Sequence, residues 1–230
     1  MALALAPALL LAACNNGVAA PPAKEKSYVL VTQIRPESLD KFFGVERGVY
    51  KLCVAAAELL HEAVKPFPTI PPDFVESRVT YANDGQRDVK REVTYWMDEV
   101  PGASDKLNGC ALRIFSRQDI YVTSGGQVQH TNIDHDGTVT IGEPQRVMTE
   151  PFRTALVALH TRPKVINGVQ LKCSDTDTCI VDPALVLVRE EYRPVYVSKR
   201  LGVKSLVLEP VSLVVGKPVD PALFLAGPAK

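Results

Sequence analysis

The 230-residue chain predicts an α+β fold that is mostly antiparallel β. Most of its segments are short, rich in β-branched and aromatic residues, and separated by Gly, Asp and Asn turns, a pattern typical of strands joined by hairpins. Helical periodicity is sustained over one long stretch, whereas a parallel βαβ fold needs a helix between most strands. We therefore expect a curved sheet or half-open barrel that is covered by an amphipathic helix.

The N-terminal part of this fold is predicted as a strand, the helix and a stiff connector. The segment 27–34, SYVLVTQI, is the first strand, and Pro36 breaks it. Over 47–65, apolar side chains recur at helical spacing on one face, with charged residues largely on the other. Four prolines within 66–72 end the helix and extend the chain. So large an apolar stripe is unstable in water, and we expect it to pack on the inner face of the sheet.

The rest of the chain is predicted as a meander of short strands. A hairpin is predicted from 78–81 and 89–96, because Asp84-Gly85 supplies the positive φ of a tight turn. The stretch 152–160 is either a short helix, with Thr149 as its cap, or a strand. Further strands are predicted at 110–115, 120–123, 127–133, 138–141, 164–173, 179–181, 185–192, 195–199 and 203–215.

The first residues look like a targeting segment. Residues 2–13 are Ala, Leu and one Pro, a run long enough for a signal peptide and too short to span a membrane. The run ends in Leu11-Ala12-Ala13-Cys14, which resembles the lipobox of bacterial envelope lipoproteins. That resemblance implies a signal peptide over 1–13, acylation of Cys14 with chains such as palmitate, a flexible tether over 14–26, and one exported domain over 27–230. The alternative is an ordinary signal, or an apolar N-terminus with an incidental cysteine.

The charge composition limits the expected partners, and the lipobox-like segment indicates the expected location. Lys and Arg number 26, as do Asp and Glu, so the overall field of the protein does not attract nucleic acid. We expect a lipid-anchored protein that faces the periplasm. Asn15, after the acylated position, does not look like an inner-membrane retention signal and favours the outer membrane.

The remaining cysteines predict two disulfide bonds. Cys53, Cys110, Cys173 and Cys179 are an even number in a chain that is predicted to be exported. Three pairings are possible. The turn-like Ser-Asp-Thr-Asp-Thr between the last two favours Cys173 with Cys179, which leaves Cys53 with Cys110. Four reduced, buried thiols are the alternative.

The last sixty residues resemble the LolA/LolB lipoprotein-carrier fold in two features. The run 216–224, GKPVDPALF, is similar to the closing segment of such curved-sheet domains, and a strand at 185–192 follows the turn between the last two cysteines. The resemblance implies a half-open barrel with a helical lid over an apolar cavity for acyl chains. It transfers no individual residue, because that cavity has no motif. The alternative is that Phe224 simply plugs the end of the sheet.

One loop carries an arrangement of oxygen ligands. The segment 132–143, NIDHDGTVTIGE, resembles an EF-hand calcium loop, with Gly at its sixth position and Glu at its twelfth. We expect Asn132, Asp134, Asp136 and Glu143 as calcium ligands; the alternative is a β-hairpin with an acidic turn. His130, His135 and Asp134 could also form an acid/base or metal cluster, against the simpler interpretation of solvated side chains.

Motifs for catalysis are missing from the sequence: it contains no G-x-S-x-G, no HExxH and no Gly-rich phosphate loop before a helix. We therefore expect a non-catalytic domain that binds an apolar ligand, such as acyl chains or a lipoprotein. The alternative is a protein-interaction or scaffold subunit of a cell-envelope assembly, with or without a structural calcium ion. An enzyme is expected only if His130, Asp134 or Glu143 line a deep cleft.

Overall fold

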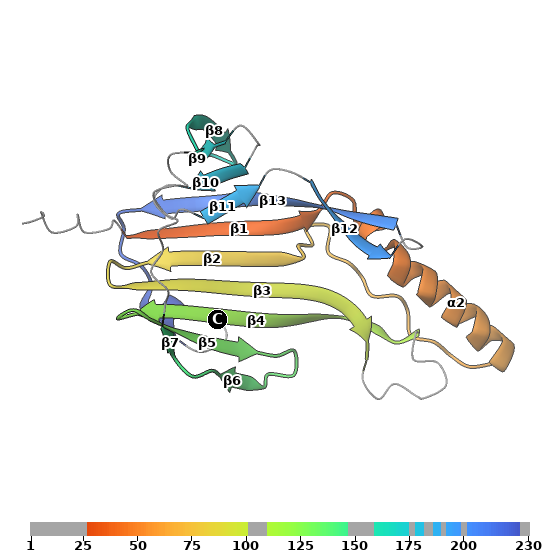
Figure 1. Ribbon diagram of the computed structural model, residues 1–230. Coiled ribbons are helices and arrows are strands. Elements are labelled where there is room, and N and C mark those ends of the chain that lie inside the picture. Colours follow the sequence, from red (N-terminus) through yellow and green to blue (C-terminus); the bar gives the residue numbers. More distant parts are fainter. Residues whose placement is uncertain are drawn as a thin grey trace, which may run out of the picture.

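A computed structural model describes residues 27–100, 110–146, 159–174, 178–181, 186–189, 192–198 and 202–225. These residues form an antiparallel main sheet in the order β12-β13-β1-β2-β3-β4-β5-β6, with β7 also paired to β5, and a small sheet in the order β11-β10-β9-β8 (Figure 1). Their bounds are β1 Tyr28–Pro36, α1 Leu39–Phe42, α2 Gly44–Leu60, β2 Ser77–Asn83, β3 Arg87–Glu99, β4 Leu112–Ser124, β5 Gln127–Ile133, β6 Val139–Ile141, β7 Gln145–Arg146, β8 Arg162–Ile166, β9 Val169–Cys173, β10 Thr178–Val181, β11 Val186–Arg189, β12 Tyr192–Ser198, β13 Gly202–Val215 and the 3-10 helix η2 Pro221–Phe224.

The predicted fold class is confirmed: the structure is mostly antiparallel β, and its main sheet is not closed. The hairpin β2–β3 turns at Asp84-Gly85 as expected, with φ of 87° at the glycine. The predicted strand 164–173 is instead the two strands β8 and β9, because Asn167 and Gly168 adopt φ of 50° and 77° and reverse the chain. The lipidation site, the tether and most of 152–160 lie outside the described residues.

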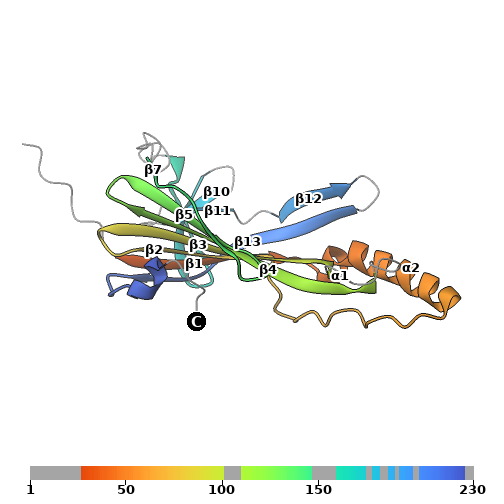
Figure 2. The same ribbon diagram turned by 90° about the horizontal axis from the view of Figure 1, so that it is seen from below.

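Two apolar clusters pack on opposite faces of the main sheet, in keeping with the period of two along each strand. The small sheet covers the face that carries Leu30, here called the front face, whereas η2 covers the back face, which carries Val89 (Figure 2). The front cluster comprises Tyr28, Leu30, Val169, Leu171, Cys173, Cys179 and Val181, and the back cluster Ala82, Val89, Ile120, Ile133 and Phe224.

The C-terminal segment is held to the back face by one arginine. Arg91, which is only 5% exposed, donates from Nη1 to the carbonyl oxygens of Ala222, Leu223 and Leu225 at 3.0–3.3 Å. Phe224 therefore sits in the back cluster, with the guanidinium of Arg87 4.2 Å from its ring centroid. Phe224 thus packs on the back face of the sheet with Val89 and Ile120.

Both predicted disulfide pairings are present. Cys173 and Cys179 are directly opposed on β9 and β10, with their Cα atoms 4.0 Å apart. Cys53 and Cys110, whose Cα atoms are 5.4 Å apart, join α2 to the start of β4.

The position of α2 differs from the expectation of a helical cover. The helix extends beyond the end of the main sheet (Figures 1 and 2), and of its residues only Ala57 is buried. The apolar residues predicted to face the sheet are exposed: Val49 by 45%, Leu52 by 75%, Leu59 by 84% and Leu60 by 57%. These four residues are called the α2 stripe below. The sheet faces are occupied by the small sheet and η2, so other segments have taken the place expected for the helix.

The opposite side of α2 packs against the proline-rich connector. The Tyr50 hydroxyl donates to the carbonyl oxygen of Lys65 at 2.9 Å, and its ring lies 5.4 Å from that of Phe67. At the base of the helix, Phe42, Phe43 and Phe74 form an aromatic cluster with ring centroids 4.9–5.9 Å apart. This cluster lies where α2 begins, next to Ile34 of β1 and Ile114 of β4. Among the described residues, no helix is long and apolar enough to cross a membrane.

Candidate apolar binding site

The predicted calcium loop is a β-hairpin turn between β5 and β6. The Asp134 carboxylate accepts a hydrogen bond from the His135 amide at 2.7 Å, and that of Asp136 accepts from Thr138 at 2.8 Å. These bonds lower the pKa of both carboxyl groups. Strands flank the turn in place of the two helices of an EF-hand.

The four predicted ligands are not brought together as a metal site. Asn132 lies in β5 and donates to Asp119 Oδ1 at 2.9 Å, and Glu143 is exposed beyond β6. Within the part of the chain that the structure describes, no group of three or more His, Cys, Asp or Glu side chains could hold a metal ion.

The two candidate histidines have separate partners on the front face. His130 Nε2 lies 2.8 Å from Asp119 Oδ1, and its ring stacks on Tyr121 with centroids 4.4 Å apart. The Nδ1 atom of His135 instead lies 3.0 Å from Oδ1 of the neighbouring Asp134, and its ring is edge-on to that of Phe115, with centroids 5.0 Å apart. Sequence reasoning missed Asp119, which becomes a neighbour of His130 only through the register of β4 and β5.

Asp119 is the electrostatic centre of this front-face network. Partial burial alone would raise its pKa, but hydrogen bonds from Asn132 and His130 and the nearby charge of Arg117 outweigh burial and lower the pKa. Arg117 Nε lies 3.2 Å from Asp119 Oδ2. The charges of the network therefore satisfy one another, as expected of a solvated sheet face.

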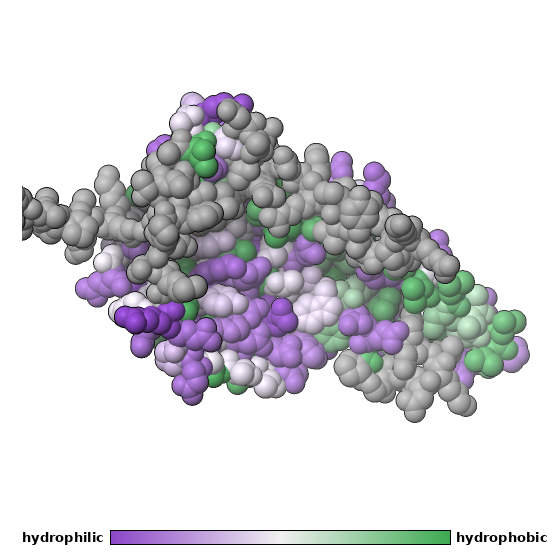
Figure 3. Space-filling model, in the orientation of Figure 1, coloured by the Kyte–Doolittle hydropathy of each residue, from purple (hydrophilic) through white to green (hydrophobic). Residues whose placement is uncertain are grey.

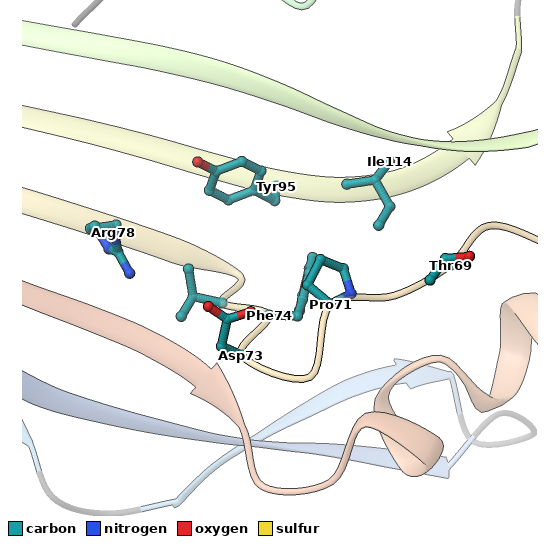
Figure 4. Close-up of a pocket in the computed structure, with 8 residues that line it drawn as sticks. Thr69, Pro71, Asp73, Phe74, Arg78, Tyr95 and Ile114 are labelled. Carbon is teal, nitrogen blue, oxygen red and sulfur yellow. The ribbon is translucent and has the colours of Figure 1, made fainter. Parts of the chain in front are cut away.

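An apolar pocket of about 390 Å³ opens beside the aromatic cluster at the α2 end of the sheet (Figure 4). Its walls come from two sources, the end of the proline-rich connector and the strands β2, β3 and β4. The volume lies within the range of small-molecule sites. The lining residues are Thr69, Pro71, Asp73, Phe74, Val75, Arg78, Tyr95 and Ile114.

The local sequence explains why the pocket stays open. Prolines lack an N–H donor, so the connector cannot add a continuous strand to the sheet. Hydrogen bonds fasten its end to the sheet: Glu76 donates its amide to the carbonyl oxygen of Ile34 at 2.8 Å, and Tyr95 donates its amide to that of Glu76 at 2.7 Å. Phe74 and Val75, just before this point, are buried and form one wall.

Besides the Thr69 hydroxyl, three polar groups border the apolar lining. Arg78 and Asp73 are exposed, and neither belongs to an ion pair among the residues that the structure describes. The third group is the hydroxyl of Tyr95, which points toward the same side of the pocket as Arg78 in Figure 4. An apolar pocket with a few polar groups at its border is typical of sites for small amphiphilic molecules.

A second apolar surface lies at the same end of the molecule. Figure 3 shows hydrophobic residues gathered at the tip where α2 projects, and the α2 stripe accounts for the most exposed of them. The front face over the central strands is predominantly hydrophilic in the same view. Exposed apolar patches of this kind mark sites of interaction.

No family model matches the chain, and neither the curated proteins nor the solved structures include a significant match to it. The fold and the site are therefore described from the structure itself: an open antiparallel sheet with an apolar pocket and an exposed apolar helix at one end. The pocket residues were not predicted from the sequence. The sequence signal that could have indicated the pocket is the proline-rich segment that is followed by the apolar pair Phe74-Val75.

Proposed function

We propose that this chain is a lipid-anchored protein of the cell envelope whose β-domain binds an apolar ligand, such as an acyl chain, without catalysis. The observation that carries the proposal is the pocket of about 390 Å³ lined by Phe74, Val75, Tyr95 and Ile114. The lipobox-like residues supply the anchor at Cys14, and the predicted disulfides, which are present in the structure, fit an oxidising compartment outside the cytosol.

The architecture presents the pocket away from the point of attachment. Tyr28, where β1 begins, lies at one end of the main sheet, and α2 projects from the other (Figure 1). A tether from Cys14 to Ser27 could reach about 45 Å when fully extended. In this proposal the tethered end faces the membrane, and the apolar end is free to meet ligands in the periplasm.

Native mass spectrometry of the purified, detergent-free chain with added dodecanol tests the ligand. We expect one bound molecule per chain. Ile114→Trp fills the pocket and should abolish binding, whereas Val139→Trp, on exposed β6, should bind as the parent does. Circular dichroism verifies that both variants are folded. Equal binding by both variants, or no binding by the parent chain, would overturn the proposal.

Intact-mass analysis tests the anchor separately. We expect a chain that begins at Cys14 and carries the added mass of its acyl chains, and a Cys14→Ser variant that is neither acylated nor processed. A parent chain of unmodified mass would remove the lipoprotein part of the proposal and leave the ligand-binding part to the pocket experiment.

A second candidate function is that of an interaction subunit of an envelope assembly. The α2 stripe favours it, because four large apolar residues of one helix are exposed. In-cell cross-linking from Lys51, beside the stripe, should capture a partner, and Leu59→Asp should abolish this capture without unfolding the chain. A stable interface of this kind buries about 1,000 Å² or more. Unchanged capture by the variant would exclude the stripe as the contact.

A further inference from the structure

The pocket has a cation at its border, Arg78, that no described carboxylate pairs with. Arg78 lies on β2, where it pairs in register with Val93 of β3, and its side chain is exposed. Within the described ranges, no carboxylate lies within ion-pair distance of its guanidinium. Because the side chain also lines the apolar pocket, a bound molecule would meet a positive charge at the edge of an apolar volume.

Four other arginines of the main sheet have partners within the chain, whereas Arg113 of β4 and Arg146 of β7, like Arg78, have no carboxylate partner among the described residues. Arg35 pairs with Glu209 at 2.7 Å, and Arg87 pairs with Asp84 at 2.8 Å. Arg117 pairs with Asp119 and Arg91 holds η2, as described above. The charge at the pocket is thus available for a ligand, whereas these four guanidinium groups have partners within the chain.

Tyr95 places a hydroxyl donor beside this charge. It lies two residues beyond Val93 on β3, so Arg78 and Tyr95 are diagonal neighbours on the back face, with an expected separation of about 7–8 Å between Cα atoms. In Figure 4 the Tyr95 hydroxyl and Arg78 lie toward one side of the pocket and Ile114 toward the other. A ligand could therefore place a polar head near Arg78 and an apolar tail along Phe74 and Ile114.

We infer that the pocket takes a single-chain amphiphile with a carboxylate head, a fatty acid, with the carboxylate on Arg78 and the Tyr95 hydroxyl and the chain against Phe74 and Ile114. This inference rests on the proposed function and specifies its ligand. A guanidinium matches a carboxylate with two parallel hydrogen bonds, which a neutral alcohol head cannot reproduce.

Asp73 gives the inference a second, opposite test. Its carboxylate also lines the pocket and repels an anionic head, which the proposed pose places on Arg78. Removing the negative charge should therefore strengthen the binding of a fatty acid and leave the binding of the corresponding alcohol unchanged.

Isothermal titration of the full chain with dodecanoate and with dodecanol, two ligands with the same chain, tests the inference. We expect dodecanoate to bind about tenfold more tightly at low salt, with the advantage shrinking at high ionic strength. Arg78→Gln should remove this advantage, and Asp73→Asn should increase it. Arg113→Gln is the matched control. Arg113 is an exposed arginine of β4 and precedes Ile114 in the chain, but its guanidinium lies over Phe115 on the front face, away from the pocket.

The outcomes separate the inference from the proposed function. If both ligands bind equally and Arg78→Gln changes neither affinity, the carboxylate inference fails while apolar binding stands. If neither ligand binds, both fail. If Arg113→Gln removes the advantage as completely as Arg78→Gln does, the effect belongs to the overall charge of the chain and the inference is again overturned.

Discussion

Truncation of the α2 stripe should cost almost no stability, in contrast to the same change in the core. The perturbation is the double variant Leu52→Ala, Leu59→Ala, compared with Leu30→Ala in the front cluster. Leu59 is 84% exposed and Leu30 is 0% exposed. Full burial of a leucine contributes about 1.5–3 kcal/mol, so the small buried fraction of Leu59 contributes about 0.3–0.5 kcal/mol and that of Leu52 slightly more.

The better helix propensity of alanine offsets part of this loss, so we expect the double variant to lose less than about 1 kcal/mol. Leu30→Ala removes a fully buried side chain and leaves a cavity, which costs about 2–5 kcal/mol. Urea unfolding of the oxidised full chain, followed by circular dichroism and by the fluorescence of Trp96, measures both free energies of unfolding.

The result that would refute the reasoning is a loss of more than 2 kcal/mol in the double variant. Such a loss would mean that the stripe is packed in the folded protein, as the sequence had predicted, and that the helix covers the sheet in solution. A small loss, combined with lost cross-linking by Leu59→Asp, would instead identify the stripe as a surface kept exposed for a partner.

Three further perturbations test the framework of the fold. Replacing Cys53 and Cys110 by Ala opens a cross-link with a sequence separation of 57 residues, and the chain-entropy estimate for a loop of that length is about 4 kcal/mol in urea unfolding. Arg91→Met removes charged hydrogen bonds to three carbonyl oxygens and should cost about 2–4 kcal/mol, with faster proteolysis after residue 220; unchanged protection would refute its role as a fastening for η2. The pKa of Asp119 is lowered by folding from its usual value of 3.8, so its stabilisation is complete above that value and is lost as the pH falls through the lower folded pKa. Between pH 5 and pH 2 the parent chain should therefore lose more stability than Asp119→Asn, and equal losses would contradict this electrostatic role.

The sequence by itself determined features that depend on near neighbours in the chain. The turn at Asp84-Gly85 is one example: Asn83 Oδ1 accepts a hydrogen bond from the Gly85 amide at 2.6 Å, and the glycine supplies the positive φ. The pairing of Cys173 with Cys179 is another, because only five residues separate them and their side chains oppose each other across a hairpin. The turn at Asn167-Gly168 is also a local signal, an Asn-Gly hairpin, which the prediction of a single strand over 164–173 missed.

The tertiary structure alone decided which surfaces are covered. Hydrophobic periodicity shows that α2 has an apolar face, but it does not show what that face meets, because the small sheet and η2 compete for the same faces of the main sheet. The pocket, too, is formed only by the tertiary structure. Phe74, Arg78, Tyr95 and Ile114 come from a connector and three strands, and their placement depends on strand register and on contacts between distant parts of the chain, which local sequence patterns do not encode.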